Sequence, residues 1–135
     1  MKKILLFVFC LANLNVSECL ENWPKIIEPE KKKQIIQEEI FYDTAVKKME
    51  DEQIIDHPEL YVQRAGIKAL LGKLEQAISD LGKAIQSNNL TEEDRIEAFA
   101  LRAILNFSLG NKEAYRIDWE TYKKLDTAKC QRQSA

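Results

Sequence analysis

Residues that interrupt regular structure or supply reactive side chains are scarce in this chain. Its 135 residues include only 4 glycines, 3 prolines and one histidine. A fold built on many tight turns uses more glycine and proline, so this scarcity favours helices. The single histidine, His57, has no second histidine or nearby cysteine with which to form a zinc site or activate a nucleophile. We therefore expect no metal site, no cofactor and no catalytic activity.

An excess of positive charge is also missing. Lysine and arginine number 20 against 22 aspartates and glutamates, which gives a formal net charge of −2. The charges alternate along the chain, whereas a nucleic-acid-binding protein needs a basic face. No nucleic acid partner is expected.

The segment 1–19 differs from the rest of the chain. Two lysines precede an uncharged apolar run, Ile4–Leu14, which is shorter than the roughly 20 residues of a membrane-spanning helix. This pattern predicts a signal peptide, cleaved near Ala12 or Ser17, and an exported protein that is periplasmic or secreted. Acylation of Cys19, as in a lipoprotein, and retention of the segment as an uncleaved anchor are the alternatives.

Two cysteines lie at opposite ends of the expected mature chain, Cys19 and Cys130. They could form a disulfide in an oxidising compartment. Lipidation of Cys19, an intermolecular bond and free thiols are the other outcomes that the sequence leaves open.

Apolar residues recur at spacings of three and four after the leader, which predicts an all-α protein with one domain. The range 29–56 predicts an N-terminal helix that starts at Pro29, or a helix pair if the chain bends near Tyr42; its later part resembles the second helix of a truncated repeat. The segment 127–135 lacks an apolar stripe, so we expect the last helix to end near residue 125 and a flexible tail to follow.

Two helical hairpins are predicted in 57–89 and 91–126. The side chain of Thr91 is a candidate cap for the N–H of Asp94. The two segments superpose without a gap at an offset of 38 residues. The identical pairs are Arg64 and Arg102, Ala65 and Ala103, Leu71 and Leu109, Gly72 and Gly110, Glu75 and Glu113, and Asp80 and Asp118. Repeated hairpins of this size stack on one another.

The segment Leu60–Gln86 resembles a tetratricopeptide repeat. The residues that carry the resemblance are a bulky residue at the start, small residues at helix contacts, and glycine at the turn: Tyr61, Ala65, Gly72, Ala77, Leu81 and Ala84. The family repeats at about 34 residues, and the longer interval here fits extra residues around Asn89. The unit from Phe99 to Leu125 is degenerate, with Tyr115 and Tyr122 at small-residue positions, which predicts a C-terminal cap.

The resemblance implies a short right-handed superhelix of antiparallel hairpins, about two repeats plus the N-terminal element. A generic bundle with two similar hairpins is the alternative. In either arrangement, Arg64 with Asp80 and Arg102 with Asp118 place opposite charges at the same point of both hairpins. We predict that they form two structural ion pairs.

The resemblance also implies that the first helix of each hairpin lines a concave surface. The corresponding residues are apolar and uncharged: Val62, Gly66, Ala69, Leu70, Ala100, Ile104 and Phe107. Such a surface suits an apolar peptide or an amphipathic helix. The alternative is that the chain's own helix in 29–55 fills it.

Together these features favour a non-catalytic protein-binding adaptor or scaffold in the periplasm or cell envelope. A secreted or surface-anchored inhibitor, such as an immunity protein, is the second hypothesis, and an enzyme is a distant third. The identity of the partner cannot be read from the sequence.

Overall fold

A computed structural model describes residues 27–54 and 56–134 of the chain. It contains five α-helices in this part: α3 (Pro29–Asp51), α4 (Glu59–Leu70), α5 (Leu74–Gln86), α6 (Glu92–Ser108) and α7 (Lys112–Ser134). No strand occurs among the described residues, which confirms the all-α prediction for them. None of these helices is both long and apolar enough to cross a bilayer. The predicted leader and Cys19 lie outside the described residues.

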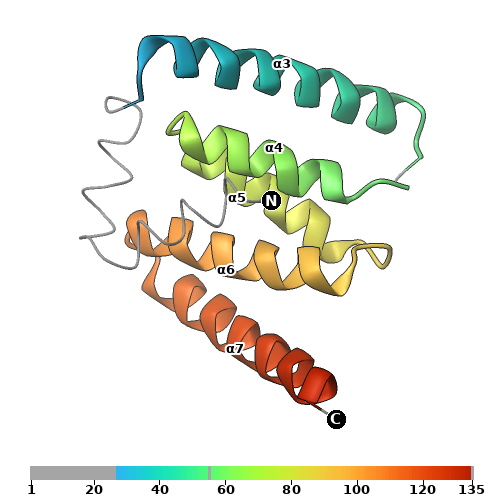
Figure 1. The fold of residues 1–135 in the computed structure, drawn as a ribbon, viewed down its shortest axis with the longest axis vertical. Helices are drawn as coiled ribbons and strands as arrows, with labels where there is room; N and C mark the ends of the chain where they lie inside the picture. The colour runs from blue at the N-terminus through green and yellow to red at the C-terminus, as the bar shows by residue number, and fades with distance from the viewer. Residues whose placement is uncertain (1–26, 55, 135) are drawn as a thin grey trace.

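The helices are layered in chain order. Each one packs against the next, and α4 also contacts α6. Figure 1 shows α3 at one end of the molecule, α7 at the other, and the α4–α5 hairpin between α3 and α6. The largest fully buried side chains belong to the middle of this arrangement, where Leu81 of α5 meets Leu101 and Leu105 of α6 in one core cluster.

The two hairpins turn in the same way. Gly72 and Gly110 have φ values of 77° and 76°, which place both in the left-handed region that favours glycine. The residue after each glycine donates its N–H back to a helix carbonyl: Lys73 to Lys68 at 2.9 Å, and Asn111 to Asn106 at 2.8 Å. These bonds belong to Schellman caps, and they recur at the offset of 38 residues found in the sequence.

The predicted helix starts at Pro29 and Thr91 are confirmed. Proline occupies the first turn of α3, where its missing N–H is not needed. The Thr91 hydroxyl accepts a hydrogen bond from the N–H of Asp94 at 3.2 Å.

Two predictions about helix ends are wrong. First, α3 continues through Tyr42 without a break, so the helix pair does not form; Glu39, Val46 and Met49 keep one face of this continuous helix buried. Second, α7 does not end near residue 125 but extends to Ser134. Its last turns are tied to the start of α6 by ion pairs, which replace the apolar stripe that the sequence lacks there.

Those ion pairs join α7 to two glutamates in the first turn of α6. Lys129 lies 3.1 Å from Glu93, and Arg132 contacts Glu92. Glu93 is fully solvated, and its bond with Lys129 lowers the pKa of its carboxyl group. The segment after residue 126 is therefore held by surface charges rather than by burial.

Candidate partner-binding surface

The two predicted ion pairs form, with matching geometry. In the first hairpin, Arg64 donates from Nε to Asp80 Oδ2 at 2.8 Å and from Nη2 to Oδ1 at 2.6 Å. In the second, Arg102 donates from Nε to Asp118 Oδ2 at 2.8 Å and from Nη2 to Oδ1 at 2.7 Å. Both aspartates are only 3% exposed. A two-point bond to a buried carboxylate fixes the angle between two helices, so we assign these arginines to structure rather than to ligand binding.

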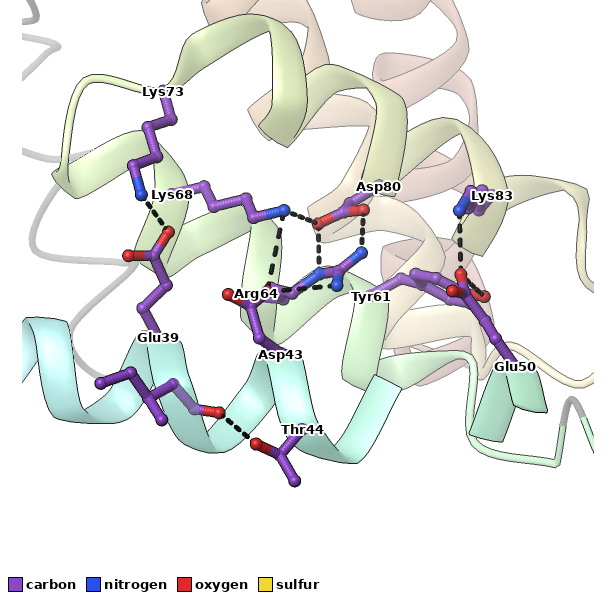
Figure 2. Close-up of polar contacts among 11 residues, drawn as sticks. Glu39, Asp43, Thr44, Glu50, Tyr61, Arg64, Lys68, Lys73, Asp80 and Lys83 are labelled. Carbon is purple, nitrogen blue, oxygen red and sulfur yellow. Dashed lines mark hydrogen bonds and ion pairs between the residues drawn. The ribbon is translucent and has the colours of Figure 1, made fainter. Parts of the chain in front are cut away.

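The first of these pairs is part of a larger network, drawn in Figure 2. Arg64 also reaches Asp43 of α3 at 3.2 Å, and Lys68 lies 3.5 Å from Asp80. Burial alone would lower the pKa of Arg64, but its hydrogen bonds to Asp80 outweigh burial and raise that pKa. Arg64 therefore stays charged, and it connects three helices at one point.

The residues predicted to line the concave surface differ in accessibility. Val62, Gly66 and Ala69 of α4 are buried, so they have no side-chain surface to offer a partner. The remaining four are at least partly accessible. Leu70, Ala100 and Ile104 are half-buried, and the side chain of Phe107 is 47% exposed.

A continuous row of aromatic rings extends from Phe107 onto α7. The ring centroids lie 5.2 Å apart for Phe107 and Tyr115, 6.1 Å for Tyr115 and Trp119, and 5.0 Å for Trp119 and Tyr122. The three α7 rings are half-buried. Burial raises the pKa of the Tyr122 hydroxyl group, and nearby Asp126 adds to that rise. We call these four residues the aromatic row.

The sequence contains a signal for this row that was read only in part. Tyr115, Trp119 and Tyr122 are spaced by four and three residues, which places them on one face of a helix. Tyr115 and Tyr122 were interpreted as features that end the stack. Their contact with Phe107, which comes from another helix, could not be inferred without the packing of α6 against α7.

The internal repeat shows what this face does elsewhere in the molecule. At the offset of 38 residues, Tyr115, Trp119 and Tyr122 correspond to Ala77, Leu81 and Ala84 of α5, which are all fully buried. The helix α5 is covered by α4 and by α6, whereas among the described helices only α6 packs extensively against α7. The aromatic row thus occupies a face that is an internal contact in the preceding hairpin.

Two further side chains complete the inventory. The thiol of Cys130 is free and exposed on α7, and its predicted alternatives involve Cys19, which is outside the described residues. The Oε1 atom of Glu97 is buried without a hydrogen-bond partner. Burial, with a smaller contribution from Asp94, raises the pKa of the Glu97 carboxyl group.

Comparison with protein-family models gives no match to this chain. Searches of curated proteins and of solved structures likewise find no similar protein.

Proposed function

We propose that this chain is a non-catalytic adaptor or scaffold, similar in architecture to tetratricopeptide repeat proteins, that docks an apolar peptide or an amphipathic helix. The aromatic row is the observation that carries the proposal. It combines large apolar area with partial exposure, and aromatic side chains are enriched at protein interfaces and among their energetically dominant residues. Phe107 belongs both to this row and to the surface implied by the repeat resemblance.

The proposed site follows the accessible edge of α6 and continues onto α7. Ala100 and Ile104 precede Phe107 on the same helix at spacings of four and three residues, and both are half-buried. Tyr115, Trp119 and Tyr122 extend this apolar strip. The three buried positions of α4 form the support beneath the site and are left out of the contact surface.

The bulk of the rings favours a partner segment over another repeat of the same chain. In α5, the small residues Ala77 and Ala84 allow neighbouring helices to approach closely. Tyr115 and Tyr122 prevent such an approach on α7. An isolated helix or extended peptide can instead place its apolar side chains between the rings, in the helix-in-groove mode of recognition.

The exported location remains part of the proposal and depends on the leader pattern of segment 1–19. A periplasmic or envelope protein of this kind would bind a segment of a larger assembly. Fusion of segment 1–19 to a reporter that is active only after export would test the location independently of binding.

The binding site is tested by comparing two exposed phenylalanines. The chain and its Phe107→Ala and Phe41→Ala variants would be used to capture partners from an envelope extract. Phe41 is exposed on α3, at the other end of the molecule. We expect Phe107→Ala to weaken the capture of a partner by about 10- to 30-fold, as removal of an aromatic anchor does, and Phe41→Ala to retain it.

A purified partner would then be titrated while the fluorescence of Trp119 is followed, in a Trp23→Phe background. Binding over the aromatic row should shift the emission of Trp119. The proposal is wrong if Phe107→Ala folds normally and binds each partner as tightly as the unmodified chain does.

A further inference from the structure

The helix α3 is attached to the rest of the molecule mainly through its acidic residues. Glu39 lies 2.6 Å from Lys73, Asp43 lies 3.2 Å from Arg64, and Glu50 lies 2.9 Å from Lys83. Figure 2 shows these carboxylates pointing from α3 towards α4 and α5. The buried apolar residues of α3 are Val46 and Met49.

This attachment leaves apolar residues on the opposite face. Ile36, Ile40 and Phe41 are 38%, 53% and 64% exposed, respectively. Their spacing places them on one side of the helix, together with the exposed polar residues Gln37 and Thr44. An apolar group of this kind on a helix at the end of a molecule points to an external contact.

Lysines flank the apolar group at both ends. Lys33 precedes it by one turn, and Lys47 and Lys48 follow it, all with exposed side chains. Lys33 pairs with Glu30 and Lys48 with Glu52, but these are solvated contacts near the helix ends and are easily exchanged. The charges of α3 are thus segregated, with paired carboxylates facing inward and lysines facing outward.

We propose that the outward face of α3 binds an anionic lipid surface, with Ile36, Ile40 and Phe41 inserted at the level of the headgroups. A helix that lies in the plane of a membrane needs an apolar group flanked by basic residues, because insertion and attraction to anionic lipids then act together. This face has both. The membrane contact is separate from the aromatic row, which lies on α6 and α7 at the far end of the molecule (Figure 1).

Other parts of the surface fit this partner less well. The aromatic row adjoins Glu113, Glu120 and Asp126 on α7, so an anionic surface would be repelled there. The first turn of α6 carries three acidic residues, Glu92, Glu93 and Asp94. Among the described helices, α3 alone combines exposed apolar residues with lysines on the same face.

A tryptophan placed at either of two positions can locate the membrane contact. Phe41→Trp and, as a matched control, Phe107→Trp would each be made in a Trp23→Phe, Trp119→Phe background and purified after export. With vesicles of equal parts phosphatidylglycerol and phosphatidylcholine, we expect the emission of the residue at position 41 to shift to shorter wavelength. No shift is expected at position 107, or at position 41 with vesicles of phosphatidylcholine alone.

Replacing Lys33, Lys47 and Lys48 with glutamine in the Phe41→Trp chain tests the electrostatic part. Each basic residue near an anionic surface contributes about a factor of five, so the lipid concentration for half of the shift should rise roughly 100-fold. Circular dichroism would check that the helices remain folded. The proposal is overturned if position 41 shows no shift, if position 107 shifts equally, or if neutral vesicles or the glutamine variant give the same result.

Discussion

The buried carboxylate of Asp118 is expected to govern the stability of the second hairpin. Asp118→Ala removes both acceptors of the Arg102 guanidinium group, and it also removes a weaker contact with Asn106 at 3.5 Å. Loss of one member of a buried pair costs about 3–5 kcal/mol when the other charge stays buried. The Arg102 side chain is 24% exposed, and water can therefore compensate for part of the loss. We expect a cost of about 2–3 kcal/mol.

The equivalent change in the first hairpin should cost more. Asp80→Ala leaves two cations, Arg64 and Lys68, whose side chains are only 12% and 10% exposed. Asp43 remains as a partner, but it is half-exposed and lies on α3. We expect the loss to fall in the upper part of the same range, about 4–5 kcal/mol, which is a large part of the 5–15 kcal/mol typical of a small domain.

Urea unfolding followed by circular dichroism would measure both values. A double variant, Arg102→Met with Asp118→Leu, removes the pair without leaving a buried charge and should be within about 1 kcal/mol of the unmodified protein. Glu30→Ala, which breaks only a solvated pair, serves as the control and should produce no measurable change. If Asp118→Ala costs less than about 1 kcal/mol, or if the effects of the two single changes simply add, the reasoning about a buried clamp is wrong.

Three further predictions concern local features of the helices. Gly82→Ala should stabilise the protein by about 0.5–1 kcal/mol, because Gly82 lies within α5 and its added Cβ would meet only an Arg102 nitrogen at 3.8 Å, whereas Gly110→Ala should destabilise it by about 1 kcal/mol because of its φ of 76°; equal urea midpoints would contradict this. Thr91→Ala should lower the free energy of unfolding by about 1 kcal/mol through loss of the cap, and Thr91→Ser should restore most of it in the same assay. Glu97→Gln should stabilise the protein at neutral pH, because the raised pKa of Glu97 means that its ionisation favours the unfolded state; the gain should disappear as the pH falls below the ordinary value of 4.5, and a gain that is independent of pH would refute this explanation.

Much of the fold could be predicted because local signals and repetition agree. Proline at the start of α3, threonine at the start of α6 and glycine after α4 and α6 each have a direct effect on the backbone. The offset of 38 residues predicted the two arginine–aspartate pairs, because equivalent positions in equivalent hairpins face the same neighbour.

The remaining features depend on contacts between helices that are distant in sequence. The last turns of α7 carry no apolar stripe, and their ion pairs with Glu92 and Glu93 cross about 36–40 residues of chain. The burial of Val62 and Ala69 depends on how neighbouring helices pack around α4, which spacing within one helix does not determine. For the same reason, the sequence could suggest an apolar surface but could not separate its accessible part from its buried part.

The arginine–aspartate clamp has one more consequence, for how such a molecule can change in length. Each clamp joins the two helices of a single hairpin, so each hairpin carries the contacts that set its own internal angle. Duplication or deletion of one 38-residue unit would leave every remaining clamp complete. New interfaces would arise only between whole units, as in other modular helical proteins.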